Sequence, residues 1–173
     1  MSTRTPLGLF ILLFALPVWA ESYLGQVVGI SDGDTIVVLD SSNVQHKVRL
    51  AGIDAPEKRQ AFGNISKQHL SRLVFGKTVT IETGKKDRFK REIGKVLVGE
   101  IDANLEQVRA GLAWHYKRYQ SEQLLIDREK YAHAEEEARR KRLGLWKDSN
   151  PVAPWEFRHP AKNRQELPRP LGK

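Results

Sequence analysis

Apolar residues between 23 and 117 come in short runs separated by turn residues, a pattern typical of β-strands. A Ser-Asp-Gly-Asp segment at 31–34 is a strong signal for a tight turn between two such runs. The predicted strands cover residues 27–30, 35–39, 44–53, 77–83 and 93–98. Short strands at this spacing indicate a small barrel or sandwich.

Helical periodicity interrupts and follows the predicted strands. An apolar stripe over 65–74 ends before Gly76, a residue suited to the position after a helix. A capping box at 104–107 predicts a two-turn helix that ends near Gly111. The longest helix is predicted at about 121–143, with one charged face that we interpret as solvated. Its apolar positions are Leu124, Tyr131, Ala134 and Ala138. Together these elements predict an α+β fold, a five-stranded barrel with about three packed helices.

The two ends of the chain differ from its centre. An almost unbroken apolar run of ten residues at 7–16 is followed by Val18 and Ala20, which suit positions −3 and −1 of a signal-peptidase site. The run is short for a membrane helix, so we expect a signal peptide at 1–20, with an uncleaved anchor as the alternative. The expected protein is secreted or periplasmic, without stable membrane association. Residues 158–173 are basic and proline-containing and are predicted to be a disordered tail, which leaves 21–157 as the domain.

Composition narrows the classes of function. Lys and Arg number 29 against 21 Asp and Glu, a net charge of +8, which favours an anionic partner. The chain has no cysteine, which excludes disulfides, a thiol nucleophile and cysteine-ligated metal sites. Nothing in the sequence indicates an oligomer, so a monomer is expected.

Three charged clusters stand where predicted strands meet turns. They are Asp-Gly-Asp-Thr at 32–35, Arg-Leu-Ala-Gly-Ile-Asp-Ala-Pro-Glu at 49–57 and Asp-Arg-Phe-Lys-Arg at 87–91. Asp34, Asp54 and Glu57 are hard oxygen donors of the kind that Ca²⁺ or Mg²⁺ prefers, and a divalent ion would offset their repulsion. Twenty residues separate Asp34 from Asp54, so an ordinary Asp-Gly turn remains the alternative for the first cluster.

Two arginines add complementary chemistry. A guanidinium binds phosphate oxygens bidentately and stabilises the charge that develops in phosphodiester cleavage. Arg49 lies on the predicted strand that leads to Asp54. Arg91 either serves the same phosphate or belongs to a basic surface with Lys85, Lys86, Arg88 and Lys90.

In this order and spacing, the three clusters resemble the signature segments of the staphylococcal nuclease family. The resemblance covers about residues 23–157. It implies an OB-fold barrel and a Ca²⁺-dependent phosphodiesterase that acts on DNA and RNA and leaves 3′-phosphate ends. The alternative is a nucleic-acid-binding OB module without catalysis, and the presence of every expected site residue favours the enzyme.

The resemblance also implies a role for each site residue. The implied metal ligands are Asp34, Asp54 and the main-chain carbonyl of Ala55. The implied catalytic residues are the general base Glu57 and the phosphate-binding arginines Arg49 and Arg91.

Other positions receive weaker assignments from the same resemblance. Asp32 matches an acidic position that supports the ligands. Phe89 and Tyr119 are candidates for stacking on a base, with packing at the barrel edge as the alternative. Two residues depart from the family pattern, since Ala55 stands where threonine is common and Lys90 where glycine is common. The change at Ala55 is expected to matter little, because only its carbonyl would contact the metal.

Overall fold

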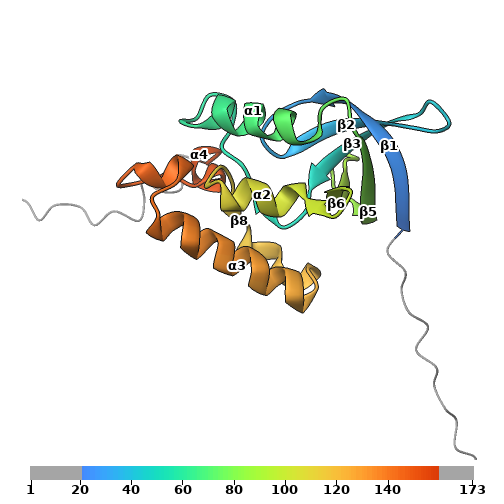
Figure 1. The fold of residues 1–173 in the computed structure, drawn as a ribbon. Coiled ribbons are helices and arrows are strands. Elements are labelled where there is room, and N and C mark those ends of the chain that lie inside the picture. The colour runs from blue at the N-terminus through green and yellow to red at the C-terminus, as the bar shows by residue number, and fades with distance from the viewer. Residues whose placement is uncertain (1–20, 160–173) are drawn as a thin grey trace, which may run out of the picture.

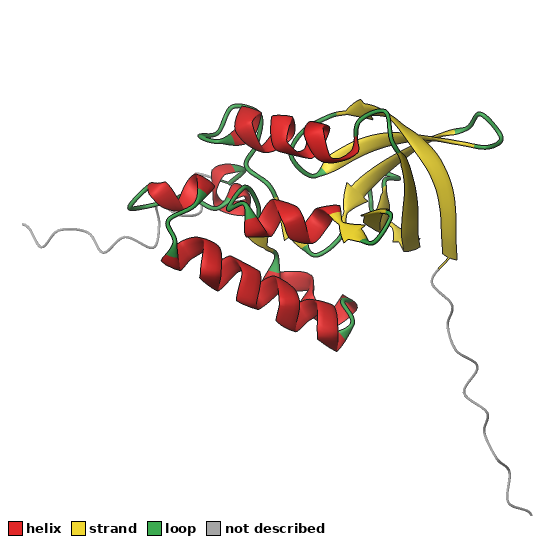
Figure 2. Ribbon diagram, in the orientation of Figure 1, coloured by secondary structure: helices red, strands yellow, loops and turns green. Residues whose placement is uncertain are grey.

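The computed structural model describes residues 21–159, whose strands form a closed barrel with the helices gathered on one side (Figures 1 and 2). The predicted signal peptide and residues 160–173 of the predicted tail lie outside the described residues. The barrel strands are β1 (Glu21–Ile30), β2 (Thr35–Asp40), β3 (Gln45–Leu50), β5 (Thr78–Lys86) and β6 (Glu92–Val98). All five predicted strands are therefore present, although the predicted strand at 44–53 is divided.

The barrel closes through one parallel pair of strands. Its sheet runs in the order β3-β2-β1-β5-β6, and the short β7 (Ile101–Asp102) continues it beyond β6. β3 and β6 then pair in parallel, with Arg49 opposite Ile93. A separate ladder joins β4 (Ile53–Asp54) to β8 (Trp114–His115). Together these pairings bring the second and third charged clusters to neighbouring strands.

Three helices of two turns or more pack beside the barrel. They are α1 (Gly63–Val74), α2 (Ala103–Arg109) and α3 (Leu125–Arg140). Shorter helical segments are the 3₁₀ helices η1 (Lys117–Glu122) and η2 (Gly144–Lys147) and the single turn α4 (Pro154–Phe157). In Figure 1, α2 lies between α1 and α3. The short α4 lies near the end of α2 that points away from the barrel. No helix within residues 21–159 is long and apolar enough to cross a membrane.

The sequence-based boundaries of the long helix and the predicted cap of α2 were wrong. The long helix starts at Leu125, because Leu124 is its extended N-cap and has a side chain that is largely exposed. It ends at Arg140, three residues before the predicted end. In α2 the capping side chain belongs to Asp102, which accepts from the Leu105 N–H at 3.0 Å. Asn104 is instead buried in the helix, where its side-chain carbonyl accepts from the Val96 N–H at 3.1 Å.

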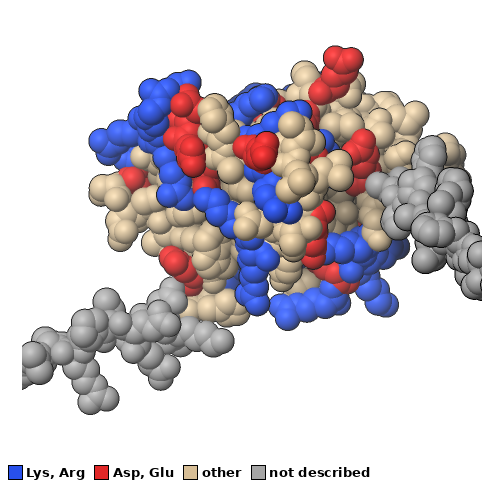
Figure 3. Space-filling view, turned by 90° about the horizontal axis from the view of Figure 1, so that it is seen from below, with Lys and Arg blue, Asp and Glu red and all other residues tan. Residues whose placement is uncertain are grey.

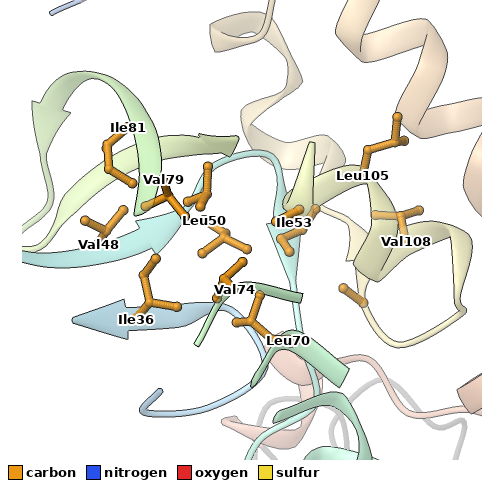
Figure 4. Close-up of a cluster of buried hydrophobic side chains, with 14 of the residues drawn as sticks. Ile36, Val48, Leu50, Ile53, Leu70, Val74, Val79, Ile81, Leu105 and Val108 are labelled. Carbon is orange, nitrogen blue, oxygen red and sulfur yellow. The ribbon is translucent and has the colours of Figure 1, made fainter. Parts of the chain in front are cut away.

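The core lies inside the barrel and continues beneath the helices (Figure 4). Alternate residues of the strands point inward, among them Ile36, Val48 and Ile81, each less than 1% exposed. Leu70 of α1 and Val108 of α2 are equally buried and continue the core from the barrel to the helices. Burial of each such side chain contributes about 1.5–3 kcal/mol to the stability of the fold. This packing holds the ends of the strands, and so the loops between them, in place.

Candidate active site

The turn between β1 and β2 delivers the first acidic residue. The Asp34 N–H donates to Asp32 Oδ1 at 3.1 Å, which shapes the turn. A Cβ on Gly33 would lie 2.0 Å from Ser66 Oγ and 2.8 Å from the Ala55 Cβ. Only glycine therefore lets the turn pack this closely on α1 and on the segment that follows β4. This close approach directs Asp34 inward.

Asp34 and Asp54 converge, as a shared site requires. Both are buried, and Asp34 Oδ2 accepts from the Ala55 N–H at 2.8 Å. Arg49 bridges the two carboxylates: its Nη1 lies 2.8 Å from Asp34 Oδ2, and its Nη2 donates to Asp54 Oδ1 at 2.8 Å. The first acidic cluster is thus not an isolated surface turn, because its second aspartate shares an arginine with the second cluster.

Burial controls the electrostatics of this group. Desolvation raises the pKa of Asp54, although the guanidinium groups of Arg158 and Arg49 act in the opposite direction. Burial and the neighbouring charge of Asp34 raise the pKa of Asp32 to about 6. Burial opposes the charge of Arg49, but the aspartates around it raise its pKa above the ordinary value. Arg49 therefore stays cationic within a buried acidic site.

Glu57 lies at the rim of the site. It follows Pro56, and its N–H donates to Gln60 Oε1 at 3.1 Å. Its side chain is 38% exposed, compared with 1% for Asp54. A carboxylate in this position lies at the edge of the buried acidic site and is also in contact with solvent water. A general base needs such access to water.

Sequence reasoning missed Arg158, which it assigned to the tail on composition. Arg158 caps α4, and its Nη2 donates to Asp54 Oδ2 at 2.7 Å. Its Nη1 donates to Glu57 Oε1 at 2.7 Å and to Asp54 Oδ1 at 3.2 Å. Pro154 at the first helical position was the available signal, since proline there is typical of a helix start.

The third cluster forms the loop between β5 and β6. Asp87 accepts from the Arg91 N–H and from its guanidinium, at 2.7–2.9 Å. Burial opposes ionisation of Asp87, but these bonds outweigh it and lower its pKa. Lys90 adopts the left-handed backbone conformation, φ 62°, that glycine favours, so the loop keeps this turn despite the substitution. Within residues 21–159, Arg91 makes no hydrogen bond or ion pair with Asp34 or Asp54, and its catalytic role stays a prediction.

The two candidate stacking residues are exposed. Phe89 is 62% exposed, with the guanidinium of Arg88 4.7 Å from its ring centroid. Tyr119 is 45% exposed and lies edge-on to Tyr116, with centroids 5.2 Å apart. Neither ring is part of the core, and base stacking by either one stays a prediction.

A cleft of about 560 Å³ lies beside α4. Trp155 of α4 lines it and stacks on Tyr116 at a centroid distance of 5.2 Å and an angle of 16°. Trp114 meets Trp155 edge-on, with centroids 5.4 Å apart. One turn of helix therefore carries Trp155 toward an aromatic cleft and Arg158 toward the acidic site.

The donor atoms suit a hard cation. Within residues 21–159, no three His, Cys, Asp or Glu side chains are grouped so that they could hold a metal ion by themselves. Asp34 and Asp54 nevertheless supply two buried carboxylates, and the buried Ala55 follows directly with its main-chain carbonyl. Oxygen donors of these kinds fit Ca²⁺, whose coordination is flexible and readily includes main-chain carbonyls and water. The donor atoms therefore match Ca²⁺ in their chemical type, and the metal-ligand roles of these residues stay predictions.

Comparison with known proteins identifies the family. Residues 47–148 match the family described as staphylococcal nuclease homologue. An uncharacterized endonuclease of Haemophilus influenzae is 45% identical over 137 residues, which are 79% of this chain and 74% of the relative. An uncharacterized endonuclease of Escherichia coli O157:H7 is 42% identical over 160 residues, 92% of this chain and 99% of the relative. A micrococcal nuclease of Shigella flexneri is 40% identical over 162 residues, 88% of this chain and 90% of the relative. The chain therefore belongs to the staphylococcal nuclease family, and its closed five-stranded barrel with packed helices is an OB-fold.

Proposed function

We propose that the protein is a Ca²⁺-dependent nuclease that hydrolyses phosphodiester bonds of DNA and RNA. The observation that carries the proposal is the convergence of Asp34, Asp54 and Arg49, with Glu57 at the rim. Membership of the family and the nuclease names of the relatives support a nuclease in general. The hard oxygen donors support calcium in particular.

Each residue of the site has a distinct task in this proposal. Asp34, Asp54 and the Ala55 carbonyl would hold the cation, which stabilises charge on the phosphate when it is bound. Glu57 accepts a proton from the attacking water. Arg49, with Arg91 from the loop before β6, neutralises the non-bridging oxygens of the phosphate in the transition state.

The bond changes follow from these tasks. Water attacks phosphorus in line and gives its proton to Glu57. The bond from phosphorus to the 5′ oxygen breaks, and that oxygen takes a proton from solvent. The products are a 3′-phosphate end and a 5′-hydroxyl end.

Charge and exposed aromatic rings support a nucleic-acid substrate that is bound with little sequence preference. The chain carries a net charge of +8, and Lys85, Arg88 and Arg91 lie beside exposed rings. On the face that carries α3, Lys and Arg side chains form several groups with Asp and Glu between them (Figure 3). On α3 itself, Glu137 pairs with Arg140 and Lys141, which supports a solvated helix face there. Contacts to phosphate should therefore come from the loops around the site, and binding should weaken with salt.

Export and a monomeric state complete the proposal. The apolar run at 7–16 and the small residues before Glu21 support secretion into the periplasm or the medium. Mass spectrometry of protein from cell fractions tests this, with Glu21 as the expected N-terminus. Full-length protein in the membrane fraction would contradict it.

Cleavage assays test the proposed activity. Purified protein is incubated with native DNA, denatured DNA and RNA, in Ca²⁺, Mg²⁺, Mn²⁺ or EDTA, and the product ends are labelled. We expect cleavage in Ca²⁺, none in EDTA, and 3′-phosphate products. DNA binding without cleavage in any of the three cations would instead favour a catalytically silent binding module.

A further inference from the structure

Arg158 is a charged residue in the site that the proposed reaction does not use. It lies just after α4, which is anchored by packing: Ala153 and Pro154 are buried, and Trp155 stacks on Tyr116. Gln60 adds a hydrogen bond to the Val152 carbonyl at 2.5 Å. The position of the guanidinium is thus set by packing of α4.

The guanidinium of Arg158 contacts the atoms that the proposed chemistry needs. It donates to both oxygens of Asp54, at 2.7 and 3.2 Å, while Arg49 donates to Asp54 Oδ1. Asp54 Oδ2 has Arg158 as its partner, at the shortest of these distances. A cation that coordinates Asp54 must therefore compete with Arg158 for the same carboxylate.

The same guanidinium also pairs with Glu57, the candidate general base. Arg158 Nη1 lies 2.7 Å from Glu57 Oε1. Glu57 Oε1 therefore accepts from Arg158, which competes with water for this oxygen. Displacement of one side chain would therefore open a metal ligand and release the base together.

We propose that Arg158 is an internal competitor of the divalent cation, which pairs with Asp54 and Glu57 and is displaced when the cation binds. The inference rests on the proposed function for the identity of the cation. The contact between Arg158 and the two carboxylates is then regulatory. The enzyme is active only where the concentration of the cation is high enough to displace the guanidinium.

Exposure makes the displacement feasible. The Arg158 side chain is 36% exposed, whereas the Asp54 side chain is 1% exposed. On displacement, the guanidinium returns to water, where it is well solvated, whereas Asp54 would be left buried with less compensating charge. A divalent ion compensates for that loss with two positive charges.

Calcium binding measured by titration calorimetry tests the proposal directly. The variants are Arg158→Gln, which removes the charge, and Arg158→Lys, which keeps the charge but cannot bridge two carboxylates with a planar fork. Lys130→Gln is the control for net charge, because Lys130 is exposed on α3 and forms no ion pair within residues 21–159. We expect the Kd for Ca²⁺ to fall about tenfold in Arg158→Gln, by less in Arg158→Lys, and not at all in the control.

Thermal unfolding provides a second readout that does not depend on activity. In EDTA, Arg158→Gln should unfold at a lower temperature than the wild type, because Asp54 and Glu57 lose a positive neighbour. With saturating Ca²⁺, the upward shift in Tm should be larger in Arg158→Gln than in the wild type. Trp155→Ala, which loosens α4 without touching the carboxylates, should move the Ca²⁺ affinity in the same direction.

The failures of the two proposals are distinguishable. Equal or weaker Ca²⁺ binding by Arg158→Gln, with a wild type that binds Ca²⁺ and cuts DNA, overturns the competitor alone. A wild type that cuts DNA in EDTA overturns the proposed calcium dependence. Absence of Ca²⁺ binding by both wild type and Arg158→Gln overturns both.

Discussion

Gln107 of α2 holds the acidic turn in place, and its replacement by leucine tests how the site is built. The side chain is fully buried, and its amide donates to the Gly33 carbonyl at 2.6 Å and to the Ser66 carbonyl at 3.1 Å. Its own carbonyl oxygen lies 2.5 Å from His69 Nδ1. One side chain thus links α2 and α1 to the turn that carries Asp34.

The expected cost of Gln107→Leu follows from these contacts. Leucine fills similar space but leaves the Gly33 carbonyl without its partner, and an unsatisfied buried group costs about 1–3 kcal/mol. Loss of the contact with His69 adds about 1 kcal/mol, for a total of about 2–4 kcal/mol. Because domains of this size are stable by about 5–15 kcal/mol, the variant should fold at 25 °C.

Urea unfolding and cleavage assays measure the effect. Gln26→Leu is the matched control, because Gln26 donates to the Gly76 carbonyl at 3.2 Å from an exposed position. It should cost less than about 1 kcal/mol, since water replaces the lost bond. Gln107→Leu should also lower cleavage activity at saturating Ca²⁺, because the Asp34 turn loses support. Equal stability of the two variants would refute the reasoning.

Two further predictions concern backbone strain and pH. Gly144 has φ 52°, and an added Cβ would lie 2.1 Å from a backbone oxygen, so Gly144→Ala should cost about 2–4 kcal/mol in urea unfolding. Gly76→Ala shares the positive φ but meets nothing within 4 Å, and should cost about 1 kcal/mol; equal losses would contradict the steric argument. Hydrogen bonds to Asp40 and Glu92 raise the pKa of His46. Its charged form therefore stabilises the fold fully below the ordinary value, about 6.5, and this contribution disappears as pH rises through the raised pKa. The stability difference between wild type and His46→Gln should shrink from pH 5.5 to pH 9 in urea titrations, and a constant difference would count against the ion pairs.

Local sequence signals predicted the strands well, because turn residues separate the short apolar runs that form them. Within the apolar run of β2, Ile36 and Val38 point into the core, and Val37 between them is less buried. The start of the long helix was less predictable. Leu124 has the spacing of a core residue, but it is extended and exposed, because the 3₁₀ segment before it uses residues that the pattern included in the helix.

The sequence predicted most residues of the site, but it did not predict the contacts between them. Asp34 and Asp54 stand out in the sequence, but their convergence depends on pairing between strands and on Gly33, whose need for glycine is a matter of close packing. The local signal at Gln107 indicated a capping box, whereas its three partners come from distant segments. Arg158 was misassigned because composition describes a segment as a whole, whereas one turn of helix after Pro154 was enough to bring it to the carboxylates.

The central claim is that Glu57 activates water for phosphodiester hydrolysis at a cation held by Asp34 and Asp54. Single-turnover cleavage of denatured DNA, in saturating Ca²⁺, measures this step for the wild type and for Glu57→Gln. Loss of a general base reduces the rate by about 10²–10⁴-fold, so we expect a decrease of at least about 100-fold. A Glu57→Gln protein that cuts within a few-fold of the wild-type rate would contradict the account.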